Sequence, residues 1–201
     1  MAEPARRRVA LLVICAATLM TIVDETVATV AIPSIQRDLG FDTASLTWVV
    51  NAYLVGFGGF LLLAGRLGDL VGRSRMLLAG MALFTVSSLA CGLAPGPAAL
   101  VVARFVQGVG GALATAVALG MIAALFPDEG ERGRAMGTYA FMGAVGASTG
   151  LVLGGLITSA LDWRWAFFVN VPIGVVAVVL SLVTWFGPEA KGVDFAGKGA
   201  T

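Results

Sequence analysis

The sequence contains no histidine and only two cysteines, Cys15 and Cys91. The absence of histidine excludes Ser-His-Asp catalysis and histidine-based metal sites, so we expect no metal centre. The topology derived below puts the two cysteines near opposite faces of a membrane. Because a disulfide joins Cα atoms within about 7 Å of each other, these two residues cannot pair within one molecule.

Charged residues are scarce as well, at 12% of a chain that is 58% hydrophobic. Soluble domains carry about 25% charged residues, whereas the mean hydropathy of this chain is +0.93. These values exclude an ordinary soluble domain. The net charge is only +1, and nucleic-acid binding depends on many positive charges, so we expect no nucleic-acid partner.

What the chain does have is long apolar runs. A helix needs about 20 apolar residues, at a rise of 1.5 Å each, to cross a bilayer. Six stretches reach roughly that length, at residues 9–32, 46–64, 76–93, 98–126, 136–161 and 165–186. They leave almost no room for an aqueous domain. We therefore expect an all-α membrane protein with one bundle over residues 9–186, preceded by an N-terminal segment 1–8 and followed by a linker segment 187–201.

The thirteen lysines and arginines are spread unevenly over the ends of these spans. One set of ends carries ten of them: Arg6, Arg7, Arg8, Arg66, Arg73, Arg75, Arg132, Arg134, Lys191 and Lys198. The opposite ends carry Arg37 and Arg164, and Arg104 lies inside the fourth span. Cytoplasmic loops hold the positive excess. We therefore expect a multi-pass protein of the inner or plasma membrane with both termini in the cytoplasm.

Three of these arginines lie in the stretch GRLGDLVGRSRM, residues 65–76, which connects the second and third spans on the cytoplasmic side. The positive-inside rule explains its arginines. It does not explain the spacing of Gly65, Gly68, Asp69 and Gly72 among them.

Ionisable residues also lie within the spans. Asp24 and Glu25 interrupt the first one, and ionisable side chains inside a membrane are usually functional. Counting along the helices places Asp24 about 8 Å and Arg104 about 9 Å below the outer edge of the hydrocarbon core. Residues of opposite charge at matched depth in one bundle should face each other or share a polar cavity.

Helical periodicity suggests which faces these residues occupy. Arg104 shares a stripe of small or polar residues with Gly108, Gly111 and Thr115, with Gln107 beside it, which favours an interior Arg104. In the first span Glu25 shares a stripe with Thr18, Thr21 and Thr29, whereas Asp24 lies about 100° away. Periodicity alone therefore favours Glu25 over Asp24 as the interior acid.

Glycines line one face of the fifth span. They recur at intervals of three, four and four residues, with one more adjacent: Gly143, Gly146, Gly150, Gly154 and Gly155. In lipid such a groove lets two helix backbones approach closely. The alternatives are generic small-residue packing and a specific functional motif.

Five segments together resemble a known family. They are residues 24–33, DETVATVAIP; 65–75, GRLGDLVGRSR; 100–112, LVVARFVQGVGGA; 146–155, GASTGLVLGG; and 163–174, WRWAFFVNVPIG. Taken in this order they resemble the N-terminal half of a major facilitator superfamily transporter, of the fourteen-helix drug:proton antiporter branch. Thr29 stands where this pattern has asparagine. Leu151 stands where it has proline, which removes the basis for expecting a kink in the fifth helix.

The resemblance implies a six-helix half-bundle built from two inverted three-helix repeats. It also implies roles for the 65–75 motif in changes of conformation. Gly65 and Gly68 would let a neighbouring helix approach, and Gly72 would form a tight turn. Asp69 would accept hydrogen bonds from a helix terminus and an arginine of the other half, with Arg73 and Arg75 holding the segment at the cytoplasmic face.

The implied activity is proton-coupled efflux of drugs or antibiotics, and hence antibiotic resistance, with no enzyme activity and no cofactor besides the proton gradient. Asp24, Glu25 and Arg104 would couple protons, with Gln107 and Gly108 completing the fourth-helix motif and the fifth-helix glycines forming the antiporter groove. The family pattern favours Asp24 over Glu25, with Arg104 favouring the ionised carboxylate when the two are close.

Exporters of this family are about twice as long as this chain or longer, so we expect a truncated or fragment chain that is not competent alone. Its partners would be the lipid bilayer, an amphipathic substrate, and either a missing C-terminal half or further copies of itself. Without that cover, Asp24, Glu25, Arg104 and Gln107 would be exposed and the glycine groove unfilled. Two alternatives remain: a non-transporting membrane scaffold, and a metabolite symporter of the same superfamily.

Overall fold

The computed structural model describes residues 3–186, with side chains for residues 7–182. The described residues are mostly helical and contain no strand. The long helices are α1 (Glu3–Leu39), α3 (Trp48–Val71), α4 (Arg73–Gly92), α5 (Pro97–Leu125), α6 (Glu129–Ala160) and α8 (Asn170–Phe186). The short helices α2 (Thr43–Leu46) and α7 (Trp165–Phe168) precede α3 and α8. Six membrane-length helical segments result, with α2 joined to α3 and α7 to α8, which confirms the six spans expected from hydropathy.

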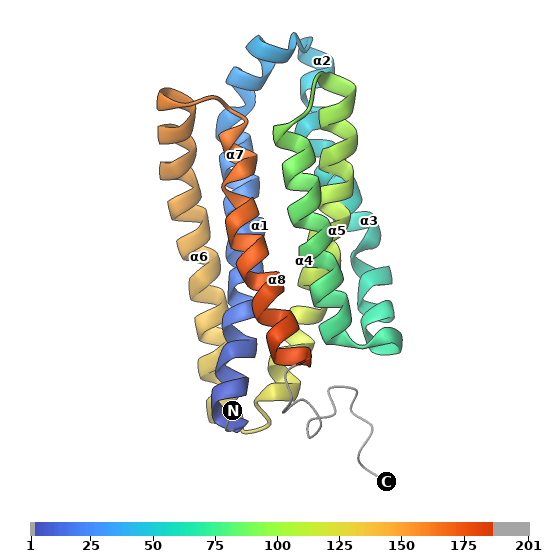
Figure 1. The fold of residues 1–201 in the computed structure, drawn as a ribbon, viewed down its shortest axis with the longest axis vertical. Coiled ribbons are helices and arrows are strands. Elements are labelled where there is room, and N and C mark those ends of the chain that lie inside the picture. The colour runs from blue at the N-terminus through green and yellow to red at the C-terminus, as the bar shows by residue number, and fades with distance from the viewer. Residues whose placement is uncertain (1–2, 187–201) are drawn as a thin grey trace.

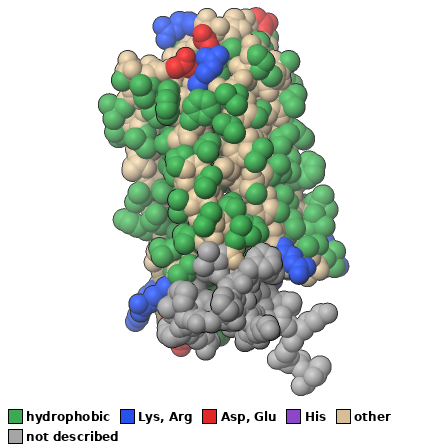
Figure 2. Space-filling model, in the orientation of Figure 1, with side chains coloured by type: hydrophobic (Ala, Val, Ile, Leu, Met, Phe, Trp, Pro, Cys, Tyr) green, Lys and Arg blue, Asp and Glu red, His purple; other side chains and the backbone are tan. Residues whose placement is uncertain are grey.

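The helices extend beyond the apolar runs. Residues 3–8, expected to precede the first span, belong to α1, while residues 187–201, with Lys191 and Lys198, lie outside the described part. Figure 2 shows apolar side chains over the middle of the visible face and charged side chains towards its two ends. That distribution is the one expected of a bundle whose middle lies in hydrocarbon.

The bundle consists of two groups of three helices (Figure 1). In one group α1 packs between α6 and α8, and in the other α5 packs between α3 and α4. The groups meet mainly where α4 contacts α8. Exchanging the first three spans with the last three, α1 for α5, α3 for α6 and α4 for α8, reproduces each of these pairings. The packing is therefore that of two inverted three-helix repeats.

Glycines set the spacing between α4 and α5. A Cβ atom added to Gly80 would lie 2.5 Å from the amide nitrogen of Ala114, and one added to Gly110 would lie 2.6 Å from that of Phe84. Hydrocarbon gives apolar helices no hydrophobic reason to associate, so such close backbone packing is a main source of helix affinity in a membrane.

The sequence suggested a loop between the second and third spans, but nearly all of this segment is helical. α3 continues to Val71 and α4 begins at Arg73, so only Gly72 interrupts the helices, with a φ of 108° that favours glycine. The tight turn expected at Gly72 is therefore present. Gly68 packs against Val117 as expected, whereas nothing among the described residues lies within 4 Å of a Cβ atom added to Gly65, so the close approach expected there stays a prediction.

The glycine groove of α6 is already filled, and the expectation that it would lack a helix is wrong. Gly143, Gly146, Gly150 and Gly154 all face α1. Cβ atoms added to Gly150 and Gly154 would each lie 3.2 Å from a Cα atom of α1, whereas one added to Gly155 would meet nothing within 4 Å. Glycine spacing predicted a close neighbour, and the first helix of the same chain takes that place.

Candidate functional site: a buried charge network

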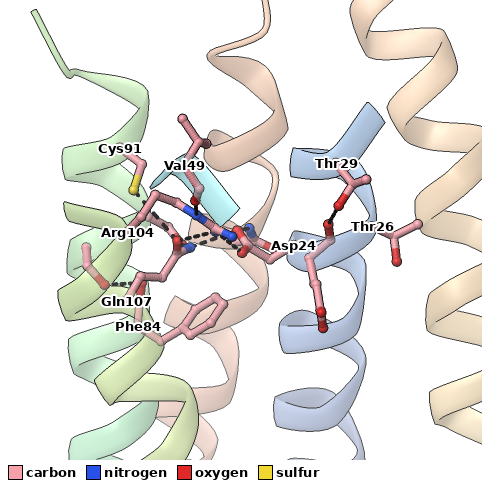
Figure 3. A network of polar contacts seen from close by, with 12 residues as sticks. Asp24, Thr26, Thr29, Val49, Phe84, Cys91, Arg104 and Gln107 are labelled. Carbon is pink, nitrogen blue, oxygen red and sulfur yellow. Dashed lines mark hydrogen bonds and ion pairs between the residues drawn. The ribbon is translucent and has the colours of Figure 1, made fainter. Parts of the chain in front are cut away.

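Asp24 and Arg104 form an ion pair inside the bundle (Figure 3). Nη1 of Arg104, on α5, donates to Oδ2 of Asp24, on α1, over 2.6 Å. The two side chains are 0% and 1% exposed, which confirms that they face each other. The expectation that Asp24, Arg104 and Gln107 would be exposed in the isolated half is wrong, because all three are enclosed by the helices of this chain.

Amide groups complete the coordination of the carboxylate. Oδ1 of Asp24 accepts a hydrogen bond from Nε2 of Gln107 and another from Nδ2 of Asn170, each over 2.7 Å. Gln107 also accepts from Nη1 of Arg104 and donates to the hydroxyl of Ser88, again over 2.7 Å. Both carboxylate oxygens therefore have donors. A buried carboxylate needs such donors to satisfy its oxygens.

The guanidinium is held on its other sides as well. Nε of Arg104 donates to the backbone carbonyl of Val49 over 3.0 Å. Its Cζ lies 4.5 Å from the ring centroid of Tyr53 and 5.7 Å from that of Phe167, distances at which an aromatic face attracts a cation. Helices α1, α3, α4, α5, α7 and α8 thus each contribute a residue to this network.

Glu25 does not join the network, although it follows Asp24 directly. Its side chain is exposed, as is that of Thr29 one turn later. The periodicity argument for an interior Glu25 is therefore wrong, and Asp24, which the family pattern favoured, is the acid that faces Arg104. Of the polar stripe of α1, Glu25 and Thr29 are exposed and Thr18 is half-buried, whereas Thr21 is buried.

The other motif residues lie at the contacts that α5 makes with α3 and with the start of α4. Gly108 and Gly111 face Tyr53 and Phe57 of α3. At the end of α3, Nη2 of Arg73 pairs with Asp69 over 3.2 Å and Nη1 donates to the carbonyl of Gly120 on α5 over 2.7 Å. Arg73 thus holds the Gly72 turn against α5. The partner expected for Asp69 in another half stays a prediction.

A second polar cluster lies at the opposite end of the bundle. Asp38 of α1 accepts hydrogen bonds from the indole of Trp163 over 3.0 Å and from Arg164 over 2.7 Å. Arg164 also lies over the Trp163 ring, 4.5 Å from its centroid. The hydrogen bond to Asp38 raises the pKa of Arg164 above its usual value. The cluster fastens the connection between α6 and α7 to the end of α1.

Sequence reasoning missed Asn170, Ser88 and Tyr53 as members of the network. Asn170 had a signal, since it is an amide within the apolar stretch FFVNVPIG. Ser88 and Tyr53 had none, because single serines and tyrosines are common in membrane helices. Among the described residues no group of three or more His, Cys, Asp or Glu side chains could hold a metal ion.

Solved structures share this fold. A bacterial homologue of the human lysosomal transporter Spinster aligns over 90% of this chain and 43% of its own, with a TM-score of 0.73 and 19% identity. The proton:xylose symporter XylE, bound to 6-bromo-6-deoxy-D-glucose, aligns over 94% of this chain and 46% of its own, with a TM-score of 0.76 and 19% identity. At this identity the two proteins show that the six-span bundle is a shared fold.

The family follows from the sequence comparison. Residues 14–200 match the model of the Major Facilitator Superfamily, and the chain belongs to that family. It is 46% identical to the puromycin resistance protein pur8 of Streptomyces alboniger, over 87% of this chain and 35% of that protein. It is 42% identical to the cephamycin export protein CmcT of Amycolatopsis lactamdurans, over 90% of this chain and 37% of that protein.

A third relative is the tetracenomycin C resistance and export protein of Streptomyces glaucescens, 41% identical over 86% of this chain and 32% of that protein. The chain therefore spans about a third of the length of these curated relatives. Membership in the superfamily, expected from the five motifs, is confirmed. The six spans also indicate a multi-pass membrane protein.

Proposed function

We propose that this chain forms the N-terminal six-helix half of a proton-coupled exporter of amphipathic drugs or antibiotics. The names of three relatives, which confer resistance to or export puromycin, cephamycin and tetracenomycin C, support this function. The observation that carries it is the buried Asp24, whose charge is balanced by one arginine in the middle of the bundle. Intramembrane acids of this kind commonly serve as proton relays.

The geometry suggests how Asp24 would couple a proton to movement. In the ionised state the carboxylate holds Arg104, Gln107 and Asn170 together through its two oxygens. A proton on Asp24 removes the negative charge that Arg104 faces and replaces an acceptor with a donor. Arg104 then keeps only the carbonyl of Val49, the amide oxygen of Gln107 and its aromatic neighbours. The contacts between α1 and α5 weaken, which would favour a different arrangement of the helices.

The remaining features of the proposal concern the whole protein. A transporter that works by alternating access needs a second six-helix bundle, which a C-terminal half or another copy would supply. This chain by itself would therefore not transport. We expect a protein of the inner or plasma membrane with both termini in the cytoplasm. It would have no enzyme activity and no nucleic-acid partner, and the proton gradient would replace any cofactor.

The test uses protein made from the complete reading frame and reconstituted into liposomes. With an imposed pH gradient we expect export of ethidium and matching proton movement, recorded with a pH-sensitive dye inside the liposomes. Asp24→Asn should abolish proton-coupled export, whereas Glu25→Gln should retain proton coupling in part. Wild-type protein that moves neither ethidium nor protons, or an Asp24→Asn variant as active as wild type, would refute the proposal.

A further inference from the structure

One atom of the buried network has no hydrogen-bond partner among the described residues. It is the side-chain oxygen Oδ1 of Asn170, a fully buried residue at the start of α8. The nitrogen Nδ2 of the same amide donates to Oδ1 of Asp24 over 2.7 Å. An ionised carboxylate has only acceptors, so it draws the nitrogen of the amide and repels the oxygen. A buried acceptor without a donor is unfavourable and calls for an explanation.

The other two side chains bonded to the carboxylate have no free acceptor. Arg104 carries donors alone. Oε1 of Gln107 already accepts from Nη1 of Arg104 over 2.7 Å, and turning this amide around would set its nitrogen against a cation. Among the described residues bonded to Asp24, Asn170 is therefore the one that can still accept a hydrogen bond.

A proton on Asp24 creates the need for such an acceptor. When a proton binds Oδ1 of Asp24, an O–H bond forms, the carboxylate becomes neutral, and the new donor faces Nδ2 of Asn170, which is also a donor. A half-turn of the Asn170 amide about its Cβ–Cγ bond exchanges nitrogen and oxygen and puts the free acceptor against the new O–H group. When the proton leaves, the amide oxygen would face a carboxylate again, and their repulsion returns the amide to its first orientation.

We propose that the amide of Asn170 follows the proton on Asp24: its nitrogen donates to the ionised carboxylate, and its oxygen accepts from the protonated one. Asn170 is thus a positioning residue that keeps a hydrogen bond to Asp24 in both states. This inference rests on the proposed function, in which Asp24 binds the proton, and it names the group that receives the resulting hydrogen bond.

The exchange changes which helices Asp24 holds together. Asp24 on α1 and Asn170 on α8 belong to one group of three helices, whereas Arg104 and Gln107 belong to the other group through α5. A proton removes the charge that binds Arg104 but keeps the hydrogen bond to Asn170. Helix α1 therefore stays with α8 while its attachment to α5 weakens, and a movement between the two groups follows.

The surroundings leave Asp24 as the group of the network that changes charge. Arg104 of α5, Tyr53 of α3 and Cys91 of α4 lie in or against the network, and their side chains ordinarily titrate above neutral pH. Glu25, the next residue of α1, is exposed. Helices α7 and α8 contain no charged residue, and the charged residues of α6 lie in its first two turns.

Infrared difference spectroscopy tests the exchange. Protein from the complete reading frame, with isotope-labelled asparagine, is reconstituted into liposomes and measured as the pH is lowered. In the wild type we expect a carboxylic-acid band that is absent from Asp24→Asn. With the same pH midpoint, one asparagine carbonyl band should shift to lower frequency, because an accepted hydrogen bond weakens the C=O bond. Asn170→Ser keeps a hydroxyl that can donate and accept, so it should retain the carboxylic-acid band and lose the amide shift.

The matched control is Asn51→Ser, which removes the other asparagine of this sequence, an exposed residue of α3, and should leave the shift unchanged. A carboxylic-acid band from Asp24 without an amide shift, a shift that persists in Asn170→Ser, or an equal loss in Asn51→Ser would each overturn the inference and leave the proposed function intact. Absence of the Asp24 band at every pH would refute the proposed function, and this inference with it.

Discussion

At the scale of single residues, Asp24 and Arg104 depend on each other. Each is a charge enclosed by apolar helices, and the structure supplies it with one partner of opposite sign. Removing either member leaves the other charged and buried, which is far more unfavourable than removing both. Lysine could not replace Arg104, since one nitrogen cannot reach Val49, Asp24 and Gln107 in the directions that the guanidinium does.

We therefore expect Arg104→Gln to lower the free energy of unfolding by about 3–5 kcal/mol. The double variant Asp24→Asn/Arg104→Gln should lose less than the sum of the two single variants, because neither charge is left alone. Unfolding by SDS, followed by circular dichroism, measures these differences. Arg132→Gln, in an exposed pair with Glu129, is the control and should change stability by less than about 0.5 kcal/mol. Strict additivity in the double variant would contradict the coupling.

At the scale of helices, the contact of α1 with α6 depends on four glycines on one face of α6. A Cβ atom added to any of the four would lie within 3.3 Å of an atom of α1, and within 3.0 Å at Gly150 and Gly154. The same helix carries Gly155 on an open side, where a Cβ atom meets nothing. Substituting alanine at a glycine that faces α1, and separately at Gly155, can therefore distinguish the effect of packing on stability from the effect of helix propensity.

We expect Gly150→Ala to destabilise the protein by about 1–3 kcal/mol through overpacking, because its Cβ atom would lie 2.9 Å from Cβ of Thr26 and 3.2 Å from Cα of Val23. Gly155→Ala should be neutral or slightly stabilising, since alanine favours a helix over glycine. The thermal unfolding midpoint of each purified variant distinguishes the two outcomes. Equal effects of both substitutions would mean that the α1–α6 seam is not tightly packed in the membrane.

The elements also show which features sequence patterns could predict. Hydropathy predicted all six spans, but the helices extend beyond the apolar runs because charged ends such as residues 3–8 and 65–71 remain helical outside the hydrocarbon. Depth along the helices predicted the pairing of Asp24 with Arg104. Periodicity failed for Glu25 because a polar stripe does not by itself show which side of a helix faces the interior. Glycine spacing on α6 predicted close contact but not that α1 makes it.

At the scale of the whole molecule, the expected orientation in the membrane rests on the distribution of positive charge, and cysteine labelling can test it. The native cysteines are buried, Cys15 in α1 and Cys91 in α4, so they should not react with an external reagent. Exposed positions exist at both ends of the bundle, at Pro95 before α5 and Glu131 in the first turn of α6.

We expect a membrane-impermeant maleimide to label Pro95→Cys but not Glu131→Cys in intact cells, because the arginine-rich ends should face the cytoplasm. Permeabilised cells should show labelling of both variants, which serves as the accessibility control. Labelling of Glu131→Cys in intact cells would show that the chain has the opposite orientation. The direction of transport that we propose would then be wrong as well.

Helix α5 joins two sites that lie far apart in the bundle. Arg104 and Gln107 engage the carboxylate of α1 near one end, and the carbonyl of Gly120 accepts the hydrogen bond of Arg73 near the other. The sixteen residues from Arg104 to Gly120 span about 24 Å of continuous helix. A helix of this length behaves as a stiff rod, so a shift along its axis strains both sets of hydrogen bonds together. If Asp24 takes up a proton as proposed, the release of α5 at Arg104 would therefore also act on the turn at Gly72.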